Sequence, residues 1–436
     1  MILGTGGKIT KLGISPEQEE IHLHNAHRTG QFWCFGTSRS GKTRLMENMI
    51  EDDIRQGLNV IAVDPKGDIP LFSKIVQVAL EEGRQEDLMF VTPIFPQYSV
   101  QFNPLEYYYM SEELVGHILS GVAVGKEPFF FNVAYETSLV IVQSILMLSK
   151  HMKNEGSFNL NDVKELVSHT DLIQLHAEMT SIEGDPQAEQ LSRDLQKIID
   201  SGQDYYNKVS SSLRVALMEL TSGNIGQVVG NAYGNKIIKR LEANGGLILI
   251  VHPGSLLTNK AAHTLGKVLI SMIQSYVGRV YSSGKIIEPA LALYIDEAQN
   301  TLYFGIEDLF AKAGGANLWI HAFSQSVNQI YSLMGEDVGK TILDNTNTKI
   351  FMRVPDKDTA EYVCQHFGTK KAYSPVLSVG GAMSVREIDK EIIDVVDVLS
   401  LQPRSFLMMG YDGRFFGKTK AISEKYIDVE FPNIIV

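Results

Sequence analysis

The sequence predicts an α/β fold with a mostly parallel sheet and an inserted all-α domain. Three observations support this prediction: short apolar strands alternate with amphipathic helices up to residue 105, strands are missing from the pattern between residues 106 and 235, and they return after residue 245. Strands that alternate with helices form parallel sheets covered on both faces. At 436 residues the chain exceeds one compact core, so an insertion or a second domain is expected.

The elements before the insertion follow one another in regular order. Strands are expected at 31–36, 59–65, 87–93 and 98–105, and helices at 42–57 and 70–83. The helix at 70–83 shows the i, i+3, i+4 spacing of an apolar face, and the helix before it stops at Gly57.

The elements after the insertion repeat this alternation. Four strands, separated by amphipathic helices, are expected at 246–253, 290–299, 317–325 and 348–355. The first 30 residues are polar and rich in turn residues. The predicted organisation is an N-terminal segment (1–30), an α/β domain (31–105 and 236–436) and an all-α domain (106–235).

The distribution of charge bears on the partners. The formal net charge of −12 by itself argues against a nucleic-acid partner. Residues 106–235, however, hold 17 acidic against 8 basic side chains, while the rest of the chain holds 34 against 31. Most of the acidity therefore lies in the insertion, and the remainder is close to neutral.

Cysteine content and hydropathy predict the compartment. The two cysteines, Cys34 and Cys364, lie 330 positions apart, which is typical of a reducing compartment. The start of the chain has no basic segment followed by an apolar one, so no secretory signal is expected. Since no run approaches 18 uninterrupted apolar residues, the sequence predicts a cytoplasmic chain without a transmembrane segment.

A glycine-rich loop follows the first predicted strand (31–36) and has the form G-x-x-x-x-G-K-[ST]. Its residues are Gly36, Thr37, Ser38, Arg39, Ser40, Gly41, Lys42 and Thr43. In such loops the backbone N–H groups turn inward around phosphates, and the next helix points its positive end at them. Lys42 is predicted to reach the β- and γ-phosphates of ATP, and Thr43 to offer its hydroxyl to Mg²⁺. The preceding strand and following helix supply the context that this motif requires.

An acidic pair ends the strand "LALYIDEAQ" (291–299). Apolar and aromatic positions run into Asp296, so its carboxylate is expected at the carboxyl end of a buried strand, beside the loop. We expect Asp296 to hold the Mg²⁺ shell, directly or through water, and Glu297 to polarise the attacking water as general base. The alternative is a strand that runs into an acidic helix start.

Two further polar stretches follow strand ends. "AFSQS" places Gln325 at the carboxyl end of the next strand, where its amide could contact the γ-phosphate or the attacking water. The alternative is a Ser/Gln helix cap. "VDPKGD" (63–68) by itself predicts only a Pro-Gly turn that carries charges.

In chain order the four motifs are the loop 36–43, "DPKGD", "YIDEAQ" and "FSQS", with a helical insertion between the second and the third. This set resembles the TraG/TraD-type coupling proteins of bacterial conjugation. Those proteins are ATPases of the FtsK/HerA class that feed DNA into type IV secretion channels. The resemblance covers about residues 25–425 and includes the stretches 344–368 and 384–422, which look like the closing strands of the family. It implies a RecA-like P-loop nucleotide-binding domain with an inserted all-α domain.

The resemblance also implies partners. The family forms rings, usually hexamers, with ATP between subunits and DNA passing through a central pore. An inserted helical domain would lie at the cytoplasmic mouth, and its acidity would suit basic partners such as a relaxase or accessory proteins. Recruitment to the cytoplasmic face of the inner membrane, at the secretion channel, is expected.

The sequence departs from the family in two places. Many coupling proteins open with transmembrane helices, whereas 35 polar-leaning residues precede the loop here. The stretch "KAGGA" has Gly314 where the family carries an arginine that inserts into the neighbouring subunit's ATP site, a contact that can be worth about 10³-fold in rate. Lys312, Lys340 or Arg353 could replace it, although each is more typical of a surface or strand-end cation.

The predicted function is an ATP-hydrolysing, DNA-translocating coupling protein that uses Lys42, Glu297 and Gln325 for catalysis. Two alternatives stay open. The chain could be a HerA-like or secretion-assembly ATPase that acts on protein, or an ATP-gated adaptor that docks protein substrates without pumping DNA.

Overall fold

The computed structural model describes residues 1–11, 13–122, 128–151, 157–377, 383–423 and 426–430. The parallel strands are β4 (Phe32–Phe35), β5 (Asn59–Val63), β6 (Leu88–Val91), β7 (Ile248–Val251), β8 (Leu291–Ile295), β9 (Leu318–Ser324) and β10 (Thr348–Phe351). The antiparallel strands are β1 (Ile2–Thr10), β2 (Gly13–Ile14), β3 (Glu19–His22), β13 (Ser405–Gly410) and β14 (Gly413–Thr419).

In the described part of the chain these twelve strands form one sheet, in the order β2-β1-β14-β13-β10-β4-β9-β8-β5-β7-β6, with β3 paired to β1. The strands from β10 to β6 run parallel, whereas β13, β14 and β1 extend the sheet in antiparallel fashion. The predicted α/β class with a mostly parallel sheet is confirmed. Because β4, β9, β8 and β5 are neighbours, the loops after these strands meet at one edge.

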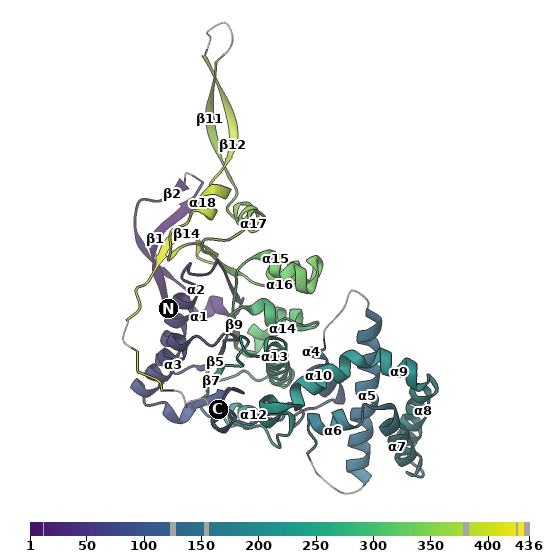
Figure 1. Cartoon of the computed structure of the whole chain (residues 1–436). Helices are drawn as coiled ribbons and strands as arrows, with labels where there is room; N and C mark the ends of the chain where they lie inside the picture. The colour runs from purple at the N-terminus through teal and green to yellow at the C-terminus, as the bar shows by residue number, and fades with distance from the viewer. Residues whose placement is uncertain (12, 123–127, 152–156, 378–382, 424–425, 431–436) are drawn as a thin grey trace.

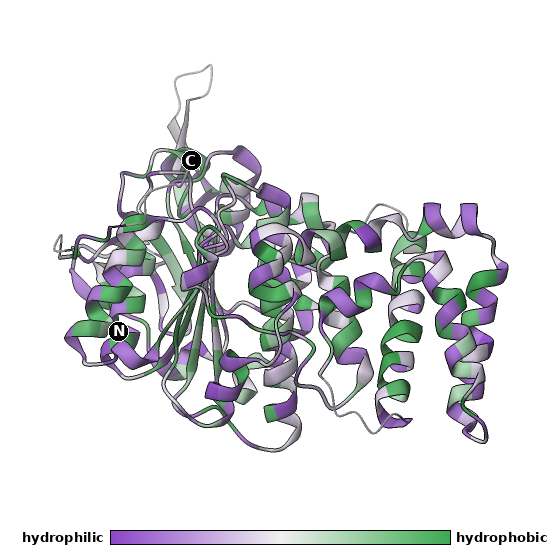
Figure 2. Ribbon diagram, turned by 60° about the horizontal axis from the view of Figure 1, so that its bottom comes forward, coloured by the Kyte–Doolittle hydropathy of each residue, from purple (hydrophilic) through white to green (hydrophobic). Residues whose placement is uncertain are grey.

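Helices cover both faces of this sheet (Figure 1). They are α1 (Asn25–Arg28), α2 (Lys42–Arg55), α3 (Ile69–Glu81), α13 (Asn259–Ser282), α14 (Ile306–Lys312), α15 (Val327–Met334), α16 (Glu336–Asp344), α17 (Lys357–Phe367) and α18 (Val395–Leu399). Successive side chains of a strand point to opposite faces: Phe32 and Cys34 pack with α2 and α3, while Trp33 and Phe35 join the core on the other face. Burial on both faces explains why the parallel strands are mostly apolar (Figure 2).

The insertion between β6 and β7 consists of helices and turns. The helices are α4 (Ser111–Ser120), α5 (Pro128–His151), α6 (Leu160–Glu165), α7 (His169–Thr180), α8 (Pro186–Asp200), α9 (Gln203–Val209), α10 (Ser211–Thr221), α11 (Gly223–Ile225) and α12 (Lys236–Glu242). They extend to one side of the sheet (Figure 1). A single hydrophobic core continues from the sheet face through α13 into α4 and α10, so the insertion is packed against the sheet.

Helix α5 contains the most apolar stretch of the insertion. Its segment Phe129–His151 is the one described helix that is long and apolar enough to cross a membrane, by length and composition alone. Half of this segment is buried against the protein, including Val140, Ile141 and Met147. This burial is what the core helix of a folded domain requires.

The strand predicted at 98–105 is wrong. The chain there forms an irregular segment with one isolated bridge, between Phe102 and Asn235. The backbone amide of Phe102 donates to the Val228 carbonyl (3.1 Å), and that of Asn103 donates to the Gly234 carbonyl (2.8 Å). These hydrogen bonds tie the segment to the returning end of the insertion rather than to the sheet.

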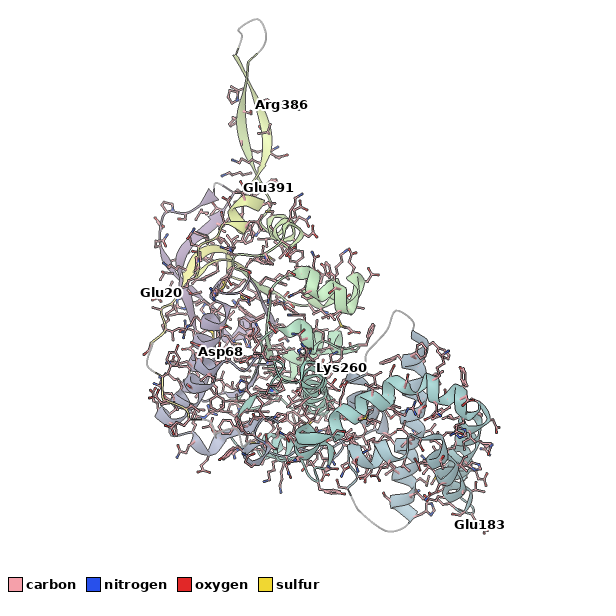
Figure 3. All side chains as sticks on the ribbon, viewed as in Figure 1. Glu20, Asp68, Glu183, Lys260, Arg386 and Glu391 are labelled. Carbon is pink, nitrogen blue, oxygen red and sulfur yellow. The ribbon has the colours of Figure 1, made fainter. Side chains whose placement is uncertain are left out.

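Two other regions carry strands that the pattern did not indicate. Within the polar segment 1–30, β1 pairs with β14 and so joins the main sheet. After α17, β11 (Thr369–Leu377) and β12 (Met383–Glu391) form a separate two-stranded sheet. This hairpin extends away from the rest of the molecule (Figure 3, where Arg386 and Glu391 are labelled on it).

Candidate nucleotide-binding site

The loop 36–43 connects the end of β4 to the start of α2. Its amides anchor it to the neighbouring strands: Gly36 N–H donates to the Ser324 carbonyl (3.1 Å), and Thr37 N–H donates to the Arg353 carbonyl (2.7 Å). Gly41 caps α2 at φ +116°, a left-handed conformation that favours glycine. The sequence therefore folds as the predicted strand, loop and helix.

Lys42 and Thr43 open the first turn of α2. The Lys42 ammonium donates to the carbonyls of Gly36 (2.5 Å) and Thr37 (3.2 Å), so it lies across the loop. Burial lowers the pKa of this ammonium below its ordinary value. An anionic ligand in the loop would stabilise the charged form of Lys42, because an anion is a stronger hydrogen-bond acceptor for an ammonium than a carbonyl is.

Asp296 lies directly after β8, where its backbone amide donates to the Val63 carbonyl (2.9 Å). Its side chain is only 6% exposed. Burial, reinforced by the nearby Asp64 carboxylate, raises the pKa of Asp296 to about 6. Asp64 ends β5 and accepts hydrogen bonds from the amides of residues 66, 67 and 68. Two carboxylates held this close would gain from a bound cation.

Glu297 follows in a left-handed backbone conformation, with φ +46°. Its carboxylate forms an ion pair with the Lys66 ammonium (2.5 Å) and accepts from the Asn300 amide (3.3 Å). Burial of the Lys66 ammonium opposes its charge, but the ion pair with Glu297 outweighs this and raises the pKa of Lys66. The "VDPKGD" stretch is thus more than a charged turn, because it brings a lysine to the predicted general base.

These side chains surround a cavity of about 330 Å³ at the carboxyl edge of the sheet. It is lined by Thr37, Ser38, Arg39, Gly41, Lys42, Thr43, Arg44, Lys66, Asp296, Glu297, Phe323, Ser324, Gln325 and Arg404. Five of these residues are cationic and two are carboxylates, a balance that fits a polyphosphate with its metal ion. Gly36 and Ser40 support the loop from behind, with the Ser40 hydroxyl directed at the Met352 sulfur (3.6 Å).

The donor set also fits Mg²⁺. This ion prefers oxygen ligands, and in nucleotide sites it takes one or two protein oxygens together with phosphates and water. Thr43 and Asp296 line the same cavity and offer a hydroxyl and a carboxylate. Within the described ranges no group of three or more His, Cys, Asp or Glu side chains could hold a metal ion, so the Mg²⁺ here would depend on phosphate and water oxygens for most of its ligands.

Gln325 lies where the sequence predicts, directly after β9, and lines the cavity. Its backbone amide donates to the Gln329 side chain (3.3 Å). The helix cap itself is the next residue, Ser326, whose hydroxyl accepts from the Gln329 amide. The Gln325 side chain is therefore not needed as the cap of α15.

The sequence reasoning missed Lys66, Arg44 and Arg404 as cavity residues. Arg44 directly follows the loop motif, so its position was a usable signal. Lys66 was visible only as part of a charged turn. Arg404 lies 361 residues after Thr43 and reaches the cavity because β13 runs antiparallel to β10, which no local pattern reveals.

Gly314 lies in the 3₁₀ turn η5 (Ala313–Ala316), where its backbone is packed against Thr29. A Cβ atom at position 314 would fall 2.1 Å from the Thr29 carbonyl oxygen. Lys312 and Lys340 form surface ion pairs within their own helices, each at 2.6 Å. Neither of these lysines lines the cavity.

Comparison with known families gives a match in the second half of the chain. A family model described as the TraM recognition site of TraD and TraG matches residues 290–393, about a quarter of the chain. The Type 4 coupling protein DotL of Legionella pneumophila subsp. pneumophila strain Philadelphia 1 is 24% identical over 168 residues. That alignment covers 36% of this chain and 21% of DotL, so the matched part spans about a fifth of that relative.

The fold is shared with solved structures of a plasmid coupling protein and of VirB4. The plasmid coupling protein TrwB in complex with ADP and Mg²⁺ superposes with a TM-score of 0.68 at 15% identity, covering 98% of this chain and 96% of that one. TrwB with a non-hydrolysable ATP analogue gives 0.65 at 16% identity, with coverage of 96% and 94%. VirB4 of Thermoanaerobacter pseudethanolicus gives 0.57 at 11% identity, with coverage of 97% and 96%.

The sequence matches and the fold agree. The family model and DotL point to coupling proteins, and the mixed sheet with its P-loop is the fold of TrwB. Together these findings show that the chain is similar to TraG/TraD-type coupling proteins, in sequence over part of its length and in fold over nearly all of it.

Proposed function

We propose that this protein is an ATP-dependent coupling protein that delivers DNA, or a relaxase–DNA complex, to a type IV secretion channel during conjugation. The observation that supports it most is the cavity at the carboxyl edge of the sheet, where a phosphate-binding loop meets two carboxylates and five cations. A cavity with this charge balance binds ATP better than an uncharged metabolite.

Five of the cavity residues take a role in ATP hydrolysis. Lys42 binds the β- and γ-phosphates, and the amides of the loop surround them. Thr43 and Asp296 hold Mg²⁺, which neutralises charge on the phosphates. Glu297 accepts the proton of the attacking water. Gln325 orients that water or the γ-phosphate.

Lys66 contributes by positioning the base. Its ion pair with Glu297 holds the carboxylate at the end of β8, in a backbone conformation that few non-glycine residues adopt. Because Lys66 also lines the cavity, its ammonium is expected to share its charge between Glu297 and the phosphates when ATP binds. Lys66 of the "DPKGD" motif thus positions Glu297 of the "YIDEAQ" motif for its role as general base.

The parts of the chain take different tasks in this proposal. The nucleotide-binding domain (31–105 and 236–436) works as a ring, with six copies, and moves DNA through the central pore. The inserted domain (106–235) docks the relaxase or accessory proteins. Its acidic character supports this role, because it holds 17 acidic against 8 basic side chains and a basic partner would be attracted to it. Glu183, for example, lies at its far end (Figure 3). The protein acts at the cytoplasmic face of the inner membrane.

One alternative is favoured by a specific observation. The backbone at Gly314 leaves no room for a side chain, so an arginine finger cannot stand at this position without a backbone shift. An ATP-gated adaptor, which binds ATP and docks protein substrates but does not pump DNA, needs no such finger. A secretion-assembly ATPase that acts on protein is the related possibility.

The test is ATP hydrolysis measured with no DNA, with single-stranded DNA and with double-stranded DNA. We expect DNA to raise the rate several-fold, Lys42→Ala to abolish nucleotide binding, and Glu297→Gln to bind ATP without hydrolysing it. Lys357→Ala, which removes an exposed lysine from a surface ion pair, is the matched control and should behave as the wild type. ATP binding with a turnover that no DNA changes would favour the adaptor, and no ATP binding at all would refute the proposal.

A further inference from the structure

Arg404 is tied to the phosphate-binding loop through its backbone. It precedes β13, and its amide donates to the Ser40 carbonyl (2.8 Å). Its own carbonyl accepts from the Thr419 amide (2.9 Å). Gly41 lies against it, since a Cβ atom at Gly41 would be 3.4 Å from the Arg404 Cα. The position of Arg404 is therefore fixed relative to the loop.

The Arg404 side chain lines the cavity. Its Nη2 donates to the Thr419 carbonyl (2.8 Å), and its Nε lies 3.4 Å from the Thr419 hydroxyl. Both of these contacts use one edge of the guanidinium. In the described part of the chain no hydrogen bond or ion pair engages Nη1, and no carboxylate neutralises the charge. A positive group is thus held in place with donors left for a ligand.

The backbone of Arg404 has φ +72°. Glycine adopts this left-handed conformation without strain, whereas the Cβ atom of any other residue makes it unfavourable. A strained residue beside a ligand cavity motivates a functional hypothesis.

The strand order indicates which end of the nucleotide Arg404 meets. At the carboxyl edge of the sheet, β4 carries the loop, and β9 and β8 bring Gln325, Asp296 and Glu297 to one side of it. On the other side stand β10 and β13, and because β13 is antiparallel its amino end, with Arg404, lies at this same edge. Since Lys42 and the carboxylates take the terminal phosphates, the nucleoside end extends towards Arg404.

We infer that Arg404 is a nucleotide-binding residue of this chain, whose guanidinium contacts the α-phosphate at the nucleoside end of ATP and of ADP. The inference rests on the proposed ATP site and adds a residue to it. The contact is charge-assisted and can be bidentate, which suits arginine better than lysine. ATP and ADP share the α-phosphate, so Arg404 serves affinity for both and leaves the hydrolytic step to the other side of the loop.

The decisive variant is Arg404→Gly, because glycine removes the side chain and keeps a backbone at φ +72° without strain. Affinities for ADP and for ATPγS, each with Mg²⁺, are measured by isothermal titration calorimetry. We expect both dissociation constants to rise about tenfold, as for the loss of one partly exposed charge-assisted hydrogen bond, and a cooperative thermal transition without nucleotide shows that the variant is folded. The dissociation constants of Arg404→Lys should lie between those of the wild type and those of Arg404→Gly.

The matched control is Asn244→Gly. Asn244 is another left-handed residue, with φ +50°, and it lies outside the cavity, so relief of backbone strain alone should leave both affinities unchanged. Equal affinities in wild type and Arg404→Gly would overturn the inference. A loss confined to ATPγS would also overturn it, because Arg404 would then act on the γ-phosphate. A wild-type protein that binds neither nucleotide refutes the proposed function itself, a result distinct from either of these.

Discussion

Replacing Asp296 with asparagine should make the metal-free protein more stable while it abolishes hydrolysis. The Asp296 carboxyl is 6% exposed, and burial together with the Asp64 carboxylate raises its pKa from 3.8 to about 6. A carboxylate with a raised pKa is one whose charged form the folded protein disfavours. Asparagine has a similar shape and carries no charge, so it removes this penalty.

The size of the effect follows from the shift in pKa. A shift of roughly 2 units corresponds to roughly 3 kcal/mol, because each unit is worth about 1.4 kcal/mol. The folded pKa is the higher one, so the penalty is absent below about pH 4, grows between pH 4 and 6, and is fully present above pH 6. The asparagine variant should therefore be the more stable protein at pH 8, and the two should converge near pH 4.

Thermal unfolding in EDTA at several pH values tests this. The unfolding entropy is about 2.1 cal/mol/K per residue, and for 436 residues this makes 3 kcal/mol equivalent to about 3 °C in Tm. Adding Mg²⁺ with ATPγS should raise the Tm of the wild type more than that of Asp296→Asn, since ligands stabilise the state that binds them. Asp308→Asn, at an exposed helix position, is the control, with an expected change within about 0.5 kcal/mol.

One outcome would refute the reasoning. If Asp296→Asn were less stable than the wild type at pH 8 in EDTA, the buried carboxylate would be a net stabilising group, and its role as a metal ligand held at a cost in stability would be wrong. A difference that did not shrink as the pH fell towards 4 would contradict the assignment of the effect to the Asp296 charge.

Two further predictions concern stability. Asp53→Ala leaves the fully buried Arg28 guanidinium without its two hydrogen bonds to Asp53, at 2.6 and 2.5 Å, so it should lower the free energy of unfolding by about 3 to 5 kcal/mol; a shift below about 1 °C in Tm would contradict this. Gly314→Ala places a methyl group against the Thr29 carbonyl and should destabilise by about 1 to 3 kcal/mol. Gly116→Ala, in open space on α4, is its control and should stabilise by about 0.5 to 1 kcal/mol.

The parallel half of the fold could be predicted from the sequence because its signals are local. Each central strand is a short apolar run, buried on both faces, and a helix with an apolar face follows it. The loop 36–43 and Asp296 were found for the same reason, since each directly follows such a strand. Parallel pairing places the carboxyl ends of these strands at one edge of the sheet, whereas which strands are neighbours is set by the sheet order, which differs from the order along the chain.

The failures arise where distant segments decide the structure. Residues 98–105 have a strand-like pattern, but the returning end of the insertion supplies hydrogen bonds to Phe102 and Asn103, and this tertiary pairing overrides the local preference. β1 lies in a polar segment, and it joins the sheet by pairing with β14, which comes from the far end of the chain. No local pattern indicates such a pairing. The glycines of β1, such as Gly6, touch the backbone of the partner strand.

Lys66 and Arg404 could not be predicted as site residues for the same reason. The Lys66 ammonium gains its role from Glu297, 231 positions later, and Arg404 gains its own from the Ser40 carbonyl. Neither residue type is unusual in a turn, so a single sequence gives no reason to select them. Only the register of the sheet brings them to the loop.

Arg404 and an arginine at position 314 could not replace each other, because they would act at opposite ends of the nucleotide. A cation at the nucleoside end stabilises bound ATP, ADP and the transition state alike, so it raises affinity and leaves kcat unchanged. A finger acts on charge that develops at the γ-phosphate, and there the Lys66 ammonium is already engaged by Glu297. On this proposal we expect one copy of the chain to hold the nucleotide well and to hydrolyse it slowly. The rate of hydrolysis, unlike the affinity, must then depend on what a neighbouring copy or a docked partner brings to the open side of the cavity.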